Sequence, residues 1–256
     1  MMVAMGQLHG WSVDAINLPE HADNPIHTDA GARAAGFPSA LVAGVTVYAY
    51  LTHPPATGWG LDWVGGGGAD VRFVAPVYDG DRVDLRVDGD IDGPSVGTAL
   101  DSPQRIDAVV GGTLRARCAV SRRAPDLSDL SDVSERAGEA LRPVRFVVDE
   151  SFIRYALRAG DDCPLYASHR VAHPVTWPSV ANRVFHRQLV TGPWIHVRSL
   201  IAHHSTAALG ETIEVVTTVV DRFDSRAGPR AVAHVRIAAA GRPVATIEHE
   251  AVIDTG

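Results

Sequence analysis

Apolar and polar residues alternate along several segments of the chain. The alternation runs through residues 83–87 and 113–120, and again through residues 231–237 and 243–252. Successive side chains of a β-strand point to opposite faces, so a period of two places the apolar residues on one face. Each segment therefore predicts a half-buried strand of an antiparallel sheet.

The two halves of the chain repeat one another. Each contains a strand, a turn of glycine beside acidic residues (Gly80 and Gly210), and an alternating strand. Upstream, residues 23–27 (DNPIH) match residues 162–166 (DCPLY), and a more helical stretch follows each. A sheet with one apolar face needs a cover, which a single helix can supply. The pattern predicts an α+β chain in which two units of sheet wrapped around a helix form one continuous sheet.

A polar, acidic stretch separates the two units. Residues 126–141 (DLSDLSDVSERAGEAL) are poor in β-branched side chains, which indicates a linker with a short helix over residues 134–141. The expected domains are residues 1–125 and residues 142–256.

The composition of the chain excludes several classes of function. The 256 residues are 46% hydrophobic and carry a net charge of −7, which argues against nucleic-acid binding. All 23 basic residues are arginine, so lysine Schiff-base, P-loop and kinase chemistry are excluded. Two cysteines, Cys118 and Cys163, cannot build a disulfide framework or a four-thiolate zinc site. With no signal peptide, and an apolar segment at residues 41–51 too short to span a membrane, we expect a cytoplasmic protein.

A motif in the first half resembles the MaoC-like family of (R)-specific enoyl-CoA hydratases and acyl-carrier dehydratases. The residues that carry it are 24–29 (NPIHTD), 34–38 (AAGFP) and 41–44 (LVAG), followed by Arg72-Phe73 and later strand residues. The match continues more weakly through the second half, which resembles the non-catalytic half of double members. The resemblance implies a double hotdog fold, with the motif in the first unit and a degenerate second unit.

The resemblance also implies roles for individual residues. His27 corresponds to the family's catalytic histidine, and a backbone N–H at or near Gly44 would stabilise the enolate oxygen. A helix N-terminus supplies such donors and a favourable dipole. Val45 and Tyr48, on the central helix, are expected to contact the substrate. The implied substrate is an acyl-CoA or acyl-carrier protein, with neither metal nor cofactor, and the chain is expected to be a monomer or a homodimer.

One departure from the family pattern affects the mechanism. The family places an aspartate five residues before the histidine, but Ala22 stands there, and the nearest carboxylate is Asp23. In the second half Asp161 fills the aspartate position, and Tyr166 replaces the histidine. The catalytic pair is therefore split between the halves.

Three consequences of this split remain open. Asp23 reaches the site through a one-residue shift, or His27 works with Asn24, which orients water, or the pocket binds an acyl chain without this reaction. Hydration of a 2-enoyl thioester is the first expectation. The rivals are thioester hydrolysis, with Asp161 or Glu211 as the activating carboxylate, and a non-catalytic acyl-binding or partner subunit.

Overall fold

A single antiparallel sheet dominates the structure. The computed structural model describes residues 6–88, 102–127, 138–190 and 192–254. Within these ranges the sheet has 11 strands, which run in the order β1-β3-β4-β5-β2-β8-β11-β10-β9-β6, with β7 also paired to β9. In chain order they are β1 (Trp11–Asp14), β2 (Gly68–Phe73), β3 (Arg82–Val87), β4 (Gln104–Val110), β5 (Thr113–Ser121), β6 (Glu139–Ala140), β7 (Val144–Val147), β8 (Ile195–His203), β9 (Thr212–Ser225), β10 (Gly228–Ala239) and β11 (Arg242–Val252).

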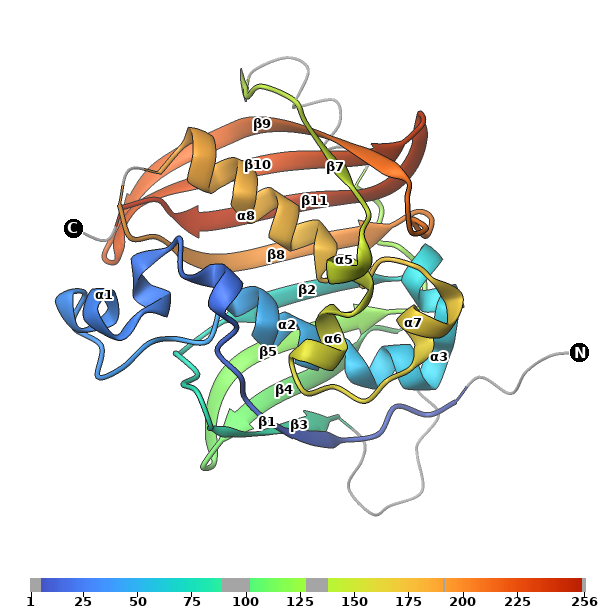
Figure 1. The fold of residues 1–256 in the computed structure, drawn as a ribbon, viewed down its shortest axis with the longest axis horizontal. Helices are drawn as coiled ribbons and strands as arrows, with labels where there is room; N and C mark the ends of the chain where they lie inside the picture. Colours follow the sequence, from blue (N-terminus) through green and yellow to red (C-terminus); the bar gives the residue numbers. More distant parts are fainter. Residues whose placement is uncertain (1–5, 89–101, 128–137, 191, 255–256) are drawn as a thin grey trace, which may run out of the picture.

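The helices cover one face of this sheet (Figure 1). Two of them, α2 in the first half and α8 in the second, lie across the strands as the central helices of the two units. The helices are η1 (Pro19–His21), η2 (Pro25–His27), α1 (Asp29–Ala34), α2 (Gly44–Leu51), α3 (His53–Gly66), α5 (Glu150–Ile153), α6 (Tyr155–Arg158), α7 (Leu165–His169) and α8 (Thr176–Gln188).

The two halves meet where β2 pairs antiparallel with β8, from Gly68 opposite Ala202 to Arg72 opposite Arg198. On each side of this seam the strands follow the same order, β2-β5-β4-β3-β1 in one half and β8-β11-β10-β9-β7 in the other. The sheet is therefore continuous across the two units, as the alternating pattern predicts.

Matching hydrogen bonds confirm that the sequence repeat is a structural repeat. The Tyr78 amide donates to the carboxylate of Asp81 at 2.8 Å, and the Ala208 amide donates to Glu211 at 2.7 Å. Likewise Val42 donates to the Val77 carbonyl and Ala172 to the Ala207 carbonyl, both at 2.8 Å. Residues 41–46 therefore correspond to residues 171–176.

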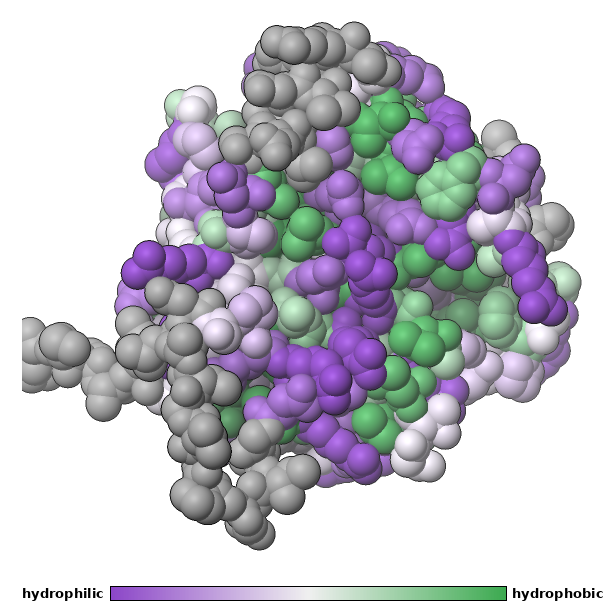
Figure 2. Space-filling view, turned by 180° about the vertical axis from the view of Figure 1, so that it is seen from behind, coloured by the Kyte–Doolittle hydropathy of each residue, from purple (hydrophilic) through white to green (hydrophobic). Residues whose placement is uncertain are grey.

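The outer face of the sheet is polar, and the inner face is the core. Figure 2 shows hydrophilic side chains gathered along the middle of the outer face. Arg198 lies there, 2.8 Å from Asp70 on β2, so this ion pair crosses the seam between the halves, and 2.7 Å from Glu248 within its own half. On the inner face α2 is buried along nearly its whole length. This alternation across the sheet is the physical reason for the period-two pattern in the sequence.

Part of the expected linker is visible. The predicted helix over 134–141 lies half outside the described residues, and Glu139 and Ala140 form strand β6 against β9 instead. Extended backbone there satisfies hydrogen bonds of β9 that a helix would leave unpaired. No helix in the described part of the chain is both long and apolar enough to cross a membrane.

Candidate active site

A cavity of about 500 Å³ lies between the two halves. The first half contributes η1, η2, the start of α2 and the end of β2, and the second half contributes α5, α6, α8 and the start of β8. One wall is largely apolar, formed by Ile26, Phe37, Leu41, Val42, Val45, Val47, Phe73 and Val77. Both units are therefore needed to enclose this space.

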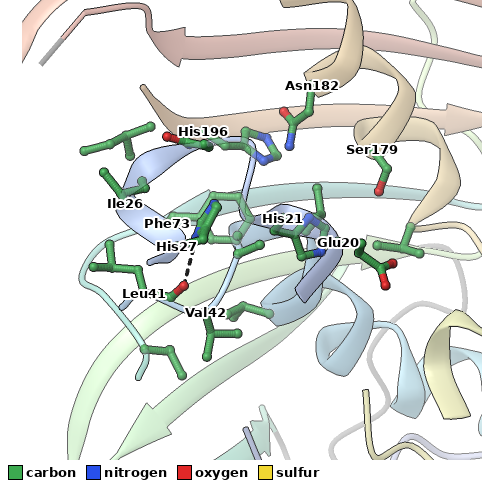
Figure 3. Close-up of a pocket in the computed structure, with 18 of the residues that line it drawn as sticks. Glu20, His21, Ile26, His27, Leu41, Val42, Phe73, Ser179, Asn182 and His196 are labelled. Atoms are coloured by element: carbon green, nitrogen blue, oxygen red, sulfur yellow. Dashed lines mark hydrogen bonds between the residues drawn. The ribbon is translucent and has the colours of Figure 1, made fainter. Parts of the chain in front are cut away.

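The motif places His27 in this cavity. Pro25 begins the short helix η2, where its missing N–H does no harm, and the turn presents His27 at its end. The backbone carbonyl of His27 accepts a hydrogen bond from Asn17 Nδ2 at 3.0 Å. His27 Nδ1 lies 2.8 Å from the carbonyl oxygen of Leu41 (Figure 3). A carbonyl only accepts, so Nδ1 carries the proton, and the lone pair of the neutral ring is on Nε2.

Burial keeps this imidazole neutral. Desolvation lowers the pKa of His27 below its ordinary value of 6.5, and the hydrogen bond to Leu41 opposes this only in part. A neutral histidine with a fixed tautomer is a suitable general base near pH 7. The structure therefore places a neutral histidine of fixed tautomer in the cavity.

The residues before His27 divide between the cavity and solvent. Ala22 is exposed and is not among the residues that line the cavity, whereas Asp23 and Asn24 both line it. Asp23 is exposed, so its carboxylate is solvated. Asn24 is 6% exposed, its Nδ2 donates to the Trp194 carbonyl at 2.9 Å, and its Oδ1 has no partner in the described structure. Of the two assisting candidates, Asn24 is the buried one.

The start of α2 supplies backbone donors to the cavity. Ala43 is the N-cap, so Gly44 and Val45 are the first two helical residues, and the first N–H groups of a helix have no intrahelical partner. Both residues line the cavity. A Cβ added to Gly44 would lie 3.4 Å from Cζ of Phe73, so the ring packs closely over this backbone. The position is suited to bind a developing negative charge.

Tyr48 lies elsewhere. Its side chain is fully buried in the core and is not among the residues that line the cavity. Desolvation raises the pKa of its hydroxyl well above the usual value. Of the two residues expected to contact the substrate, Val45 therefore lines this cavity and Tyr48 does not.

A second histidine, His21, also lines the cavity, and sequence reasoning missed it. Its ring centre lies 5.9 Å from that of His27. His21 Nε2 shares a hydrogen bond of 2.8 Å with the Tyr155 hydroxyl, which in turn lies 2.7 Å from Thr46 Oγ1. Burial, with a smaller contribution from the nearby His27, lowers the pKa of His21 to about 4. The family motif, an aspartate five residues before the histidine, does not include position 21, so the sequence carries no signal for this neighbour.

The second half contributes a third histidine. His196, 6% exposed, lines the cavity beside Phe73, with 4.7 Å between ring centres. Its Nε2 lies 2.9 Å from Ser199 Oγ, which lies 2.8 Å from His249 Nδ1. Burial lowers the pKa of His196 to about 3, so this ring is neutral at pH 7.

The corresponding place in the second half is filled. Tyr166 stands where His27 stands in the first half, and His173 and Pro174 stand where Ala43 and Gly44 do. Tyr166 and His173 are buried, with ring centres 4.2 Å apart. Pro174 has no N–H to offer. The second unit therefore lacks both the histidine and the backbone donor of the first.

Asp161, the carboxylate that fills the family's aspartate position, has a different partner. It is 1% exposed, and its Oδ1 lies 2.7 Å from His53 Nδ1 at the start of α3. The indole of Trp11 stacks on His53 with ring centres 4.0 Å apart. Ligand atoms of His53, Asp161 and Asp162 lie within 4.8 Å of one another, but the first two already form a hydrogen bond. Asp161 thus joins the two halves away from the cavity.

We predict that Asp161→Ala lowers the free energy of unfolding by about 2–4 kcal/mol, because it leaves buried His53 and the Cys163 amide without their shared acceptor. Urea denaturation measures this loss. Asp162→Ala, at an exposed neighbour, is the matched control and is expected to change stability by less than about 0.5 kcal/mol. Equal losses in the two variants would contradict a structural role for the pair.

The similarities of this chain to known proteins are similarities of three-dimensional structure. No family model matches the chain, and no curated protein matches it. A conserved hypothetical protein of Mycobacterium tuberculosis, Rv0216, described as having a double hotdog fold, superposes with a TM-score of 0.66 at 14% identity, over 98% of this chain and 96% of that one. A putative MaoC domain dehydratase from Chloroflexus aurantiacus gives 0.62 at 10% identity over the whole of both chains.

A protein with a different name has a similar structure too. The tesB protein of Mycobacterium avium subspecies paratuberculosis gives a TM-score of 0.51 at 14% identity, over 99% of this chain and 95% of that one. At these low identities, the superpositions establish a shared architecture. The chain therefore has the double hotdog fold described for Rv0216, and MaoC-like dehydratases of known structure superpose on the same architecture.

Proposed function

We propose that the protein catalyses the reversible hydration of a 2-enoyl thioester carried on coenzyme A or a carrier protein. The observation that carries the proposal is the arrangement of His27. Its tautomer is fixed by the Leu41 carbonyl, and it lines the same cavity as the N-terminus of α2. A neutral base beside oxyanion donors is the combination that addition to a thioester-conjugated double bond requires.

The proposed reaction uses one water molecule and one base. His27 Nε2 takes a proton from water as the water oxygen forms a bond to the β-carbon of the substrate. The π electrons of the double bond move toward the thioester oxygen, which becomes an enolate held by the Gly44 amide. The proton on Nε2 then passes to the α-carbon, which restores the thioester and the neutral imidazole.

Asn24 assists in this proposal. The partnerless Oδ1 of Asn24 is suited to accept a hydrogen bond from the attacking water, while Nδ2 donates to the Trp194 carbonyl. Asp23 is solvated at the exposed edge of the cavity, so we give the assisting role to Asn24. Val45 contacts the substrate beside Gly44.

The carrier phosphate also has a candidate partner. Of the arginines that line the cavity, Arg183 and Arg187 are exposed and one helical turn apart on α8. Guanidinium groups bind phosphate through paired hydrogen bonds. We propose that they bind the phosphate of the carrier, and that one chain, with its two units already paired, supplies a complete site.

Thioester hydrolysis is the rival on the same fold. The two carboxylates considered for it, Asp161 and Glu211, are not among the residues that line the cavity. Glu211 is paired with Arg242 at 2.7 Å and accepts from the Ala208 amide. Incubation with a 2-enoyl-CoA separates the two reactions. Hydration consumes the conjugated double bond, whereas hydrolysis releases free thiol, and thiol release without hydration would overturn the proposal.

We expect the acid limb of the pH profile of kcat/KM to lie below pH 6.5. His27 must be neutral to accept a proton, and burial lowers its pKa, so the active form persists to lower pH than for a solvated histidine. Activity is then lost as pH falls through the lowered pKa. Initial rates from pH 5 to pH 8 measure this, and a limb at or above pH 6.5 would contradict a buried neutral base.

A further inference from the structure

One wall of the cavity carries more hydrogen-bonding groups than an unsubstituted acyl chain can use. Along α8, the side chains of Thr176, Ser179, Asn182 and His186 all line the cavity. Their spacing of three, three and four residues puts them on one face of the helix. Figure 3 shows Ser179 and Asn182 pointing from α8 into the cavity, on the side opposite Val42 and Leu41. We call these four residues the polar face of α8.

The polar face has unsatisfied hydrogen-bonding capacity. Thr176 Oγ1, Ser179 Oγ, Asn182 Oδ1 and His186 Nδ1 are each shielded from solvent and have no partner among the described residues. Thr176 is fully buried. Buried polar atoms without partners are costly, and natural proteins keep few of them. An ordinary solvent-facing side of an amphipathic helix would leave these atoms in water.

Neighbouring groups extend this polar surface. His196 and Asn24 are each 6% exposed and line the same cavity, and His196 Nδ1 and Asn24 Oδ1 also lack partners in the described structure. The opposite face of α8, with Val180, Val184 and Phe185, is buried against the sheet. The polar face is therefore directed at whatever occupies the cavity.

The position of these groups separates the acyl group from its carrier. A carrier arm has to reach solvent, and the exposed residues of the cavity, including Arg183 and Arg187, mark that side. Thr176, Tyr155 and Phe152 line the cavity and are buried, so they lie where the acyl group extends inward. Hydroxyl groups of the protein at this buried location can form hydrogen bonds with oxygen atoms of the acyl group, whereas methylene groups offer them no partner.

We propose that the acyl group bound here carries hydroxyl or oxo substituents, which hydrogen-bond to the polar face of α8. The inference rests on the proposed function in one respect, that the cavity holds an acyl thioester. It adds the substrate class, an oxygenated acyl chain in place of a plain fatty acyl chain. The two walls contact different parts of the acyl group: the α2 side contacts its hydrocarbon, and the α8 side contacts its oxygen atoms.

Binding of non-reacting ligands tests the proposal without hydration. The probes are a saturated medium-chain acyl-CoA and chain-matched counterparts with one hydroxyl or oxo group scanned along the chain. Calorimetry gives Kd for wild type, for Ser179→Ala/Asn182→Leu, and for Ser168→Ala, an exposed helical serine outside the cavity lining. Wild type and Ser168→Ala are expected to bind the best oxygenated probe about 10- to 100-fold more tightly than the plain chain. In the double variant this ratio is expected to fall to about one.

The same measurement separates the possible sources of the polar contacts. Repeating it with N-acetylcysteamine thioesters, which lack most of the carrier, should keep the preference for oxygenated chains. Equal binding of all probes by wild type, or a preference that vanishes without the carrier, overturns the inference. A preference that persists while no enoyl thioester is hydrated would remove only the proposed function, whereas hydration without any preference would remove only this inference.

Discussion

Replacing Gly44 by proline should lower kcat/KM for 2-enoyl thioester hydration about 100- to 1,000-fold, because it removes the backbone N–H that we assign to the enolate oxygen. Gly44 is the first residue of α2 and lines the cavity. Loss of one oxyanion donor typically has an effect of this size. The chain already has a proline at the corresponding position of the second unit, Pro174.

The substitution should leave the fold in place. The first helical position tolerates proline, whose absent N–H has no intrahelical acceptor there. Ala43, the preceding residue, has φ −59° and ψ 138°, which is the extended conformation that a residue before proline prefers. Circular dichroism and the thermal midpoint check that the variant is folded.

Gly44→Ala is the matched control because it keeps the N–H. Its added Cβ would lie 3.4 Å from the Phe73 ring, a close contact that a small ring movement relieves. We expect less than about a 10-fold loss for alanine, since close packing changes typically cost about 1 kcal/mol. Equal losses for alanine and proline would show that space at this position matters and that the donor does not.

The second large effect is expected at His27. His27→Ala should reduce kcat/KM about 100- to 10,000-fold, the usual contribution of general acid–base catalysis by a positioned side chain. The variant loses the only group that the proposed reaction uses to move a proton. The disappearance of the conjugated enoyl thioester, followed by absorbance, measures the rate.

His169→Ala provides the comparison for a histidine outside the site. His169 is exposed at the end of α7 and does not line the cavity. Its loss should leave the rate within about twofold of wild type, because surface substitutions away from a site have small effects. If His27→Ala retained comparable activity, another cavity histidine, His21 first, would have to be the base.

Much of the architecture is local in origin and so is predictable from the sequence. Alternation along β3, β5, β10 and β11 defines strands with one buried face, and the repeated glycine-acid turns define two equivalent units. The position of His27 is also local, because Pro25 and the short helix η2 fix the turn that presents it. These features depend on residues a few positions apart, which a sequence displays directly.

Only the tertiary structure determines which residues surround His27 in the cavity. Whether Ala22 or Asp23 faces the cavity depends on a short 3-10 turn, where a shift of one residue redirects a side chain and no periodicity shows which one points inward. His21 meets Tyr155 across 134 residues, and Asp161 meets His53 across 108. The polar face of α8 reads in the sequence as the solvent side of an amphipathic helix. Only the packing of the two units against each other encloses it beside His27, because burial belongs to the folded chain and not to the helix alone.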